Sequence, residues 1–124
     1  MTRARRLGLA CAAAFTLAVW GGFAALSRAE TSSANGKDAP VAIQLFQFTP
    51  SPVAVEAGTR VTWTNQDDIN HTVTSGTPEN RDGRFDGKLS GKGTTFTFDF
   101  TQPGTYPYFC ARHQSMRGEI RVNP

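Results

Sequence analysis

Residues 104–118 read Gly-Thr-Tyr-Pro-Tyr-Phe-Cys-Ala-Arg-His-Gln-Ser-Met-Arg-Gly, and this stretch carries the clearest structural pattern in the chain. Tyr106, Tyr108 and Cys110 stand two residues apart, so an extended strand would place them on one face. Phe109 would then point to the opposite face. The aromatic residues favour packing in a core, and the stretch therefore predicts a strand whose buried face ends at a cysteine.

The same alternation of apolar and polar residues recurs along the chain and indicates strands rather than helices. The predicted strands cover residues 41–48, 53–56, 60–65, 94–100, 105–110 and 118–123. Turn-forming residues separate several of these segments at 50–52, 57–58 and 102–104. Many short strands with such turns predict an all-β fold, a two-sheet β-sandwich with Greek-key connections.

One segment between the predicted strands, residues 75–93, has no assigned structure. It is polar, contains five glycines and is too long for a simple hairpin loop. Phe85 and Leu89 are expected to anchor it to the core. The alternating phenylalanines of the 94–100 segment share one face of their strand and are also expected in the core.

The N-terminus, residues 1–29, predicts an export signal that is not part of the fold. Three arginines precede a mostly apolar run at 7–26, and the small residues Ser27 and Ala29 suit cleavage. The Arg5-Arg6 pair allows twin-arginine export beside the general secretory route. Because a membrane helix needs about 20 apolar residues, an uncleaved anchor is the main alternative. We therefore expect a periplasmic or otherwise exported protein, attached to a membrane only if this segment is retained.

The rest of the chain is expected to be a linker and one domain. Residues 30–40 are rich in small and polar residues, which is typical of a flexible linker, and the domain covers residues 41–124. The chain after residue 29 contains nine basic and ten acidic residues, a formal charge of −1. Because the domain has no run of basic residues, there is no reason to expect nucleic acid as a partner. The protein is also expected to be a monomer.

The residues that can carry chemistry are few once the signal is set aside. Cys11 lies within the signal, so Cys110 is the single cysteine of the mature chain. In an oxidising compartment a solitary cysteine needs burial, a partner chain or a metal. Cys110, His113 and Met116 stand three apart, so one tight loop can turn all three side chains toward a common point. This spacing favours a metal over a merely buried thiol.

The mature chain supplies one thiolate, two imidazoles and one weak thioether, which are the ligands of a blue-copper electron-transfer site. Zinc is not usually bound by a thioether such as that of Met116, and a structural zinc site would need a fourth strong ligand. The predicted ligands of a single type 1 copper ion are His71, Cys110, His113 and Met116. His71 is assigned as a ligand because it is one of only two histidines in the sequence and the site needs two imidazoles. The glycosylation signal Asn70-His71-Thr72 is set aside, because a glycan there would sit on a metal ligand.

The immunoglobulin domain is the competing sandwich fold. Trp63 and the Tyr-x-Tyr-x-Cys run at 106–110 resemble its core tryptophan and its tyrosine corner. The hallmark of that fold is a disulfide between the two sheets, and Cys110 has no cysteine to pair with in the mature chain. This absence argues against the immunoglobulin fold.

The sequence resembles the cupredoxins, and within them most the amicyanins, with the plastocyanins and pseudoazurins further away. The resemblance covers nearly all of the mature chain. It is carried by Val-Glu-Ala-Gly-Thr-Arg-Val-Thr-Trp-Thr-Asn at 55–65, by His71 and by residues 104–118, with their two-residue gaps on either side of His113. It implies a Greek-key sandwich with the copper near one end, where His71 comes from its own strand region and the last long loop supplies the other ligands.

The resemblance also implies that His113 exposes one ring edge and serves as the electron port. Two departures from the family pattern bear on the surroundings of the copper. Thr72 stands where amicyanin and plastocyanin have asparagine, so a supporting hydrogen bond would be made differently. Polar residues replace the prolines and the aromatic residue around the port, which predicts a more polar and cationic surface. The candidates for support of the site or for the port are Asn70, Thr72, Arg112 and Gln114.

The predicted function is the transfer of single electrons between a redox-protein donor and a redox-protein acceptor by Cu(II)/Cu(I) cycling, without enzymatic activity. The alternative is a copper-binding protein for delivery or storage. Proteins of that class tend to expose several methionines or histidines, whereas Met116 is the single methionine after the signal. A copper oxidase or reductase would need more histidines than the two present, because it has additional copper centres.

Overall fold

The computed structural model describes residues 37–124, and all regular structure in that range is β-strand. The strands are β1 (Asp38–Gln44), β2 (Gln47–Thr49), β3 (Val53–Glu56), β4 (Thr59–Asn65), β5 (His71–Gly76), β6 (Arg81–Leu89), β7 (Thr95–Phe100), β8 (Gly104–Phe109) and β9 (Arg117–Asn123). No helix in the described range is long and apolar enough to span a membrane. The all-β prediction is confirmed, and the predicted export signal at 1–29 lies outside the described residues.

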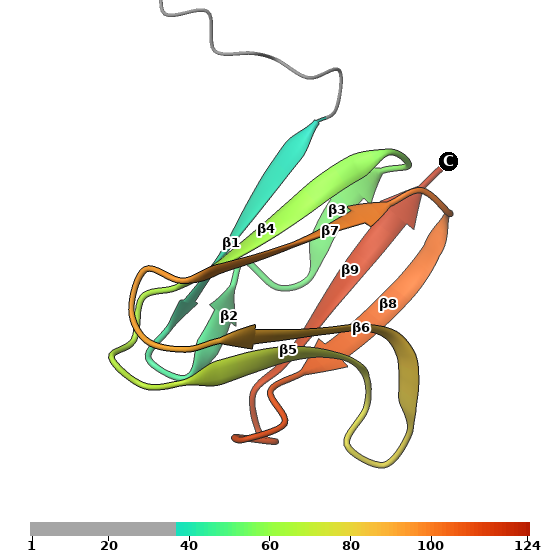
Figure 1. Cartoon of the computed structure of the whole chain (residues 1–124). Coiled ribbons are helices and arrows are strands. Elements are labelled where there is room, and N and C mark those ends of the chain that lie inside the picture. Colours follow the sequence, from blue (N-terminus) through green and yellow to red (C-terminus); the bar gives the residue numbers. More distant parts are fainter. Residues whose placement is uncertain (1–36) are drawn as a thin grey trace, which may run out of the picture. The chain divides into compact units, whose positions relative to one another are not determined.

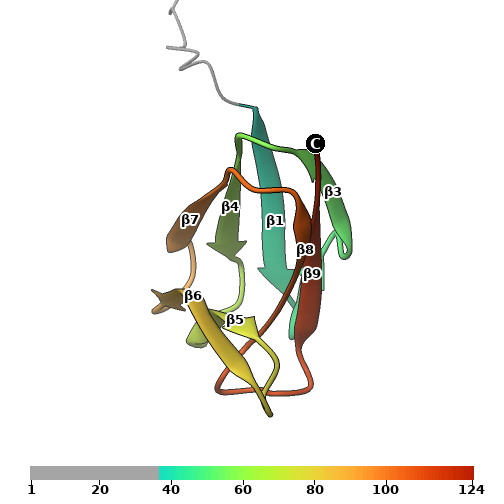
Figure 2. The ribbon, with the colours of Figure 1, turned by 90° about the vertical axis from the view of Figure 1, so that its right-hand side faces the viewer.

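The strands form two sheets that face each other across one core (Figure 1, Figure 2). One sheet has the strand order β2-β1-β4-β7, and the other has the order β3-β9-β8-β5-β6. Both sheets are mixed, because β1 runs parallel to β4 and β3 runs parallel to β9, while the other paired strands are antiparallel. The predicted two-sheet sandwich is confirmed.

The first strand begins earlier than the sequence pattern predicts. β1 starts at Asp38, three residues before the expected domain start at Val41 and within the predicted linker at 30–40. Asp38 pairs with Arg60 of β4, so the ladder already includes residues that lack an apolar pattern. Backbone groups make the ladder hydrogen bonds, and they can therefore extend a strand beyond its apolar residues.

The segment at 41–48, predicted as one strand, is two strands joined by a tight turn. β1 ends at Gln44 and β2 begins at Gln47, which leaves Leu45 and Phe46 as the turn. Both turn residues have positive φ angles, 52° and 60°, as a type I′ hairpin turn requires. Such turns usually contain asparagine or glycine, so two large apolar residues gave no turn signal in the sequence.

Much of the segment at 75–93 forms a hairpin, because β5 and β6 pair antiparallel. Phe85 and Leu89 are buried, and they anchor β6 to the core as expected. Gly87 lies between them on the same face, where the ring of Phe96 occupies the space that a Cβ would need. A glycine at a core-facing position concealed the strand period in the sequence.

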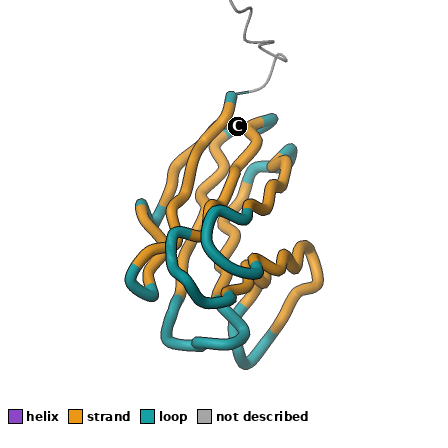
Figure 3. Tube along the Cα trace, turned by 60° about the vertical axis from the view of Figure 1, so that its left-hand side comes forward, coloured by secondary structure: helices purple, strands orange, loops and turns teal. Residues whose placement is uncertain are grey.

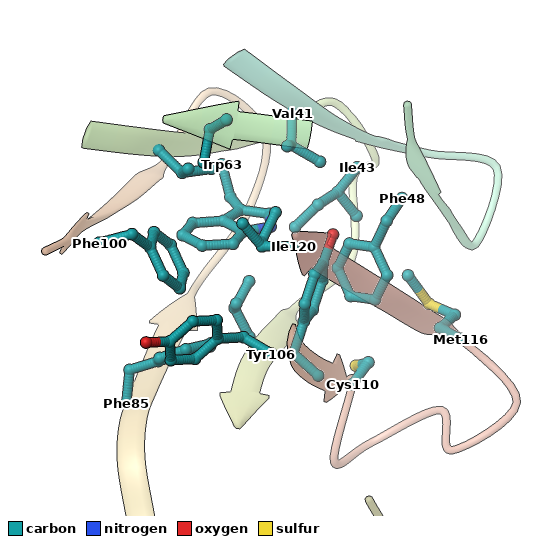
Figure 4. Close-up of a cluster of buried hydrophobic side chains, with 14 of the residues drawn as sticks. Val41, Ile43, Phe48, Trp63, Phe85, Phe100, Tyr106, Cys110, Met116 and Ile120 are labelled. Atoms are coloured by element: carbon teal, nitrogen blue, oxygen red, sulfur yellow. The ribbon is translucent and has the colours of Figure 1, made fainter. Parts of the chain in front are cut away.

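The core between the sheets is built around aromatic side chains (Figure 4). Trp63 is fully buried, and its ring centre lies 5.4 Å from that of Tyr108 in an edge-on arrangement. The three phenylalanines of β7 pack in or against this core, as expected. Phe109 lies on the opposite face of β8, yet it is buried because the guanidinium of Arg81 covers its ring at 5.5 Å.

The hydroxyl of Tyr108 is buried without a hydrogen-bond partner among the described residues, and so is the indole N–H of Trp63. Gly118, opposite Tyr108 on β9, leaves space for the tyrosine ring, because a Cβ there would collide with its hydroxyl end. Burial raises the pKa of Tyr108 to about 12, although the nearby Trp63 N–H acts in the opposite direction. The native state therefore keeps this proton at pH values where an unfolded tyrosine loses it.

We expect the free energy of unfolding to fall as the pH rises from 10 to about 12, because the folded chain then binds one proton more than the unfolded chain. The loss should be about 1.4 kcal/mol per pH unit, and the contribution is fully present below pH 10. Urea unfolding of the wild type and of Tyr108→Phe across this pH range measures it. Parallel pH profiles for the two proteins would contradict the effect of the buried hydroxyl.

Candidate metal centre

The four predicted ligands come from the start of β5 and from the loop between β8 and β9. That loop lies at the end of the sandwich away from the C-terminus (Figure 1), where several loops gather (Figure 3). His71 is the first residue of β5, and the other three lie in the loop between β8 and β9. The N–H of Cys110 donates to the Met116 carbonyl at 3.1 Å, and the N–H of Met116 donates to the His113 carbonyl at 2.8 Å. These two backbone hydrogen bonds close the loop and hold its side chains together.

The potential ligand atoms of the two histidines and the cysteine converge on one point. Nδ1 of His71 and Nδ1 of His113 each lie 3.7 Å from Sγ of Cys110. All three atoms lie within 4.8 Å of one another. Met116 is buried next to Cys110 at the same end of the core (Figure 4). Metal bonds of about 2.0–2.3 Å are compatible with these separations, and the donor set of thiolate, imidazoles and thioether suits copper.

The four side chains differ in their access to solvent. Cys110, His71 and Met116 are 0%, 1% and 2% exposed, whereas His113 is half-buried. The sulfur atoms therefore lie in a dry environment, which helps to set the redox properties of a metal–thiolate bond. His113 is the least buried member of the set.

Asp67 fixes the orientation of His71. The Nε2 atom of the imidazole lies 2.9 Å from Oδ2 of Asp67, which accepts its N–H. This leaves Nδ1 with a free lone pair that faces Cys110. Burial raises the pKa of the Asp67 carboxyl, but hydrogen bonds from Leu45 N–H, the His71 ring and Phe46 N–H outweigh it and hold the pKa below its ordinary value. Asp67 therefore stays charged and continues to orient the ring.

The same carboxylate stabilises the turn between β1 and β2. Its Oδ1 accepts the N–H of Leu45 at 2.8 Å, and its Oδ2 accepts the N–H of Phe46 at 3.2 Å. A non-glycine residue at positive φ costs about 1–3 kcal/mol, and a hydrogen bond to a charged group contributes about 1.5–3 kcal/mol. The two effects are comparable in size, so Asp67 can offset the strain of the turn.

The strained turn places an aromatic ring against both histidines. The ring centre of Phe46 lies 5.7 Å from that of His71 and 5.1 Å from that of His113, edge-on in both cases. Phe46 is 51% exposed, so one part of its ring covers the imidazoles and another part faces solvent. The turn that the sequence pattern concealed therefore forms part of the candidate centre.

Asn65 orders the loop that carries Asp67. It is fully buried, its Nδ2 donates to the carbonyls of Ile69 at 2.7 Å and Gly91 at 3.0 Å, and its Oδ1 accepts the Asp67 N–H at 3.0 Å. Asn65, Asp67 and Phe46 support the site but were not predicted from the sequence. An aspartate four residues before His71 was the one available signal, and it occurs in a loop where acidic residues are common.

Thr72 shows how the site is supported where the related families have asparagine. Its backbone N–H donates to Sγ of Cys110 at 3.3 Å, and its Oγ1 accepts the N–H of Ala111 at 2.7 Å. One residue thus contacts both the cysteine sulfur and the backbone that follows it. Asn70, in contrast, is exposed, and within residues 37–124 no hydrogen bond joins its side chain to the four candidate ligands.

The exposed side chains of the ligand loop, the β1–β2 turn and the loop before β5 include both charged and apolar ones. Arg112 and Gln114 are exposed, as the sequence suggested. Leu45 is 77% exposed beside Phe46, and Ile69 of the loop that Asn65 holds is 39% exposed. The polar, cationic surface predicted from the sequence is therefore only part of this end of the molecule.

Comparison with known proteins agrees with this geometry. A family model described as copper binding proteins, plastocyanin/azurin family, matches residues 37–123. The chain belongs to this family. The match covers every strand and all four candidate ligands.

Relatives of this copper-binding protein include amicyanins and a plastocyanin. Amicyanin-alpha of Methylorubrum extorquens is 32% identical over 95% of this chain and 98% of its own length. Amicyanin of Paracoccus denitrificans is 27% identical over 90% of this chain and 92% of its own length. Plastocyanin of Scenedesmus fuscus is 34% identical over 60% of this chain and 85% of its own length. The resemblance seen in the sequence is confirmed.

Solved structures give the same result. A purple cupredoxin from Nitrosopumilus maritimus matches with a TM-score of 0.64 and 27% identity, over 69% of this chain and all of the other. A Cu(I) structure of an amicyanin mutant matches with a TM-score of 0.59 and 28% identity, over 73% of this chain and 85% of the other. The cupredoxin fold is confirmed, and so is the predicted cofactor, one copper ion.

Replacement of Asp67 by alanine should lower the affinity for copper by about 10- to 100-fold, because His71 loses the group that orients its ring. Titration of the copper-free protein against a competing chelator measures this. Asp68→Ala is the matched control, because Asp68 is the next residue, is exposed and makes no hydrogen bond to His71. Equal affinities for the two variants would contradict the role assigned to Asp67.

Proposed function

We propose that this protein carries single electrons between redox proteins and holds one copper ion with His71, Cys110, His113 and Met116. The observation that carries the proposal is the convergence of the buried Cys110 sulfur and one ring nitrogen from each of two imidazoles, all within 4.8 Å of one another. When bound, the copper ion supplies one-electron chemistry by alternating between Cu(II) and Cu(I). The predicted lack of enzymatic activity is part of the proposal.

The residues around the centre suit an electron carrier because they keep the ligands in place. Asp67 fixes the ring of His71, and Thr72 donates to the sulfur of Cys110. The backbone hydrogen bonds of the β8–β9 loop hold the remaining ligands. Ligands that scarcely move lower the reorganisation that accompanies a change of one charge. The preorganised site therefore supports electron transfer rather than delivery of the metal.

We infer that electrons pass through His113, because its ring is less buried than the other three ligands. We define the port face as His113 with the exposed side chains of Leu45, Phe46, Ile69 and Arg112. Its apolar members can be buried against a redox partner, and Arg112 can attract an acidic one. Residues 37–124 contain nine basic and nine acidic side chains, so local charge rather than net charge would steer the encounter.

Export to the periplasm is also part of the proposal. Its support is the sequence of residues 1–29, in which arginines, an apolar run and small residues follow in the order typical of a signal.

The copper-loaded protein should be intensely blue, because a short bond between Cu(II) and the Cys110 thiolate gives strong charge transfer. Absorption spectroscopy after copper titration measures the colour. Cys110→Ser is the control and should abolish it while the fold is kept, since serine has nearly the same shape. A colourless wild type with bound copper, or a Cys110→Ser variant that stays blue, would refute the proposed ligand set.

Oxidation of the reduced protein by hexacyanoferrate(III), an anionic reagent, should slow as ionic strength rises, because salt screens the attraction to Arg112. The Debye length is about 10 Å at 0.1 M, so the effect should be largest below that concentration. Arg112→Glu should slow the reaction further without any change in the blue spectrum. Stopped-flow kinetics measure these rates.

The control for this experiment is Arg84→Glu, the same change of charge beside Tyr106 near the start of β8 rather than in the ligand loop. It should leave the rate close to that of the wild type. Equal rates for both variants, or rates that do not respond to salt, would show that Arg112 does not steer the reagent.

A further inference from the structure

A chain of hydrogen bonds runs from an exposed carboxylate on β6 to the metal-binding loop. The Thr74 hydroxyl donates to Oδ1 of Asp86 at 2.8 Å. Oγ1 of Thr72 and Oγ1 of Thr74 lie 3.0 Å apart, and the N–H of Ala111 donates to Thr72 at 2.7 Å. We call these four groups the Asp86 relay. They connect the outer face of a sheet with the residue that follows Cys110.

The two ends of the relay determine the direction of every hydrogen bond in it. The carboxylate of Asp86 can only accept, so the single hydroxyl proton of Thr74 points to it. Thr72 must then donate its own proton to Thr74, which leaves a lone pair of Thr72 for the N–H of Ala111. Each hydroxyl thus accepts one hydrogen bond and donates one. Hydrogen bonds in such a chain polarise one another, so each one strengthens its neighbours.

The strand register explains why these groups meet. Thr74 pairs with Asp86 on β6 and with Phe109 on β8, so it lies between the two strands. Thr72 and Thr74 stand two apart on β5 and share a face, opposite to that of His71. Both hydroxyl-bearing side chains are buried, whereas Asp86 is exposed. The relay therefore passes through the protected outer side of the sheet.

We propose that Asp86 and Thr74 are positioning residues for the copper centre, which they influence through Thr72 without contact to any ligand. This inference rests on the proposed function. A polarised Thr72 hydroxyl holds the N–H of Ala111, and the backbone N–H of the same Thr72 donates to Sγ of Cys110. Hydrogen bonding around the cysteine sulfur is one of the factors that tune the potential of such a site. The relay therefore holds Thr72 in the position from which it makes both hydrogen bonds, and its hydrogen bond to the sulfur favours Cu(I).

The test uses the full chain, four single variants and the double variant that combines Thr74→Val with Asp86→Ala. Thr74→Val removes the hydroxyl and keeps the shape, and Thr97→Val on the other sheet is its control. Asp86→Ala removes the acceptor, whereas Asp86→Asn retains an oxygen that can accept from Thr74. Asp86 is exposed, so these two variants leave the core intact. Thermal unfolding of each variant confirms that it is folded.

The first readout is amide hydrogen exchange of Ala111 in the copper-free protein, measured by NMR. Exchange should be up to about twofold faster in Thr74→Val and in Asp86→Ala, because the hydrogen bond from Ala111 to Thr72 remains and loses only the strengthening of about 10–30% that its neighbours provide. Asp86→Asn and Thr97→Val should exchange like the wild type. In the Thr74→Val background, Asp86→Ala should have no additional effect, because the relay is already interrupted.

The second readout is the reduction potential of the copper-loaded protein, which should fall in Thr74→Val and stay constant in Thr97→Val. Wild-type exchange at Ala111 in Thr74→Val, or an unchanged potential, would overturn the relay. Equal effects of alanine and asparagine at position 86 would also overturn it, in favour of a plain charge effect. A wild type that forms no blue site would refute the proposed function instead, and the Ala111 exchange data would still report on the relay.

Discussion

The carboxylate of Asp67 connects the parts of the molecule on which the metal centre depends. It accepts the backbone N–H groups of Leu45 and Phe46 and the ring N–H of His71. Three separate requirements are met by one charged group: the strained turn is stabilised, the aromatic ring of Phe46 is placed over the histidines, and the imidazole is oriented. The buried side-chain amide of Asn65 holds the loop in which this carboxylate lies, so the geometry of the centre also depends on Asn65.

The centre is supported from both of its sides by different sheets. The turn of the β2-β1-β4-β7 sheet covers the histidines. In the other sheet, β5 supplies His71 and Thr72, and the loop after β8 supplies Cys110. Thr72 contacts the sulfur and the next peptide group with its backbone and its side chain. Support from two directions limits the movement of the ligands, as an electron carrier requires, and leaves His113 as the most open side of the site.

Elements with a local residue pattern were predicted correctly from the sequence, whereas elements stabilised by distant residues were missed. Alternation in Tyr106, Tyr108 and Cys110 is a local pattern, and it predicted a strand with a buried face. The strand β6 was missed because Gly87 occupies a core-facing position, where the ring of Phe96 fills the space. The turn at Leu45 was missed because its positive φ is stabilised by a distant carboxylate rather than by glycine or asparagine.

The sequence by itself determined which metal and which ligands to expect, because the chain after residue 29 contains one cysteine, two histidines and one methionine, and because three of these four are evenly spaced. It also determined the sandwich, since strand alternation is periodic. Only the tertiary structure decided how the site is supported. Leu45 and Asp67 are 22 residues apart, and Thr72 and Ala111 are 39 residues apart. Single polar contacts at such separations leave no period in the sequence, and only the folding of strands, turns and loops together brings their partners into contact.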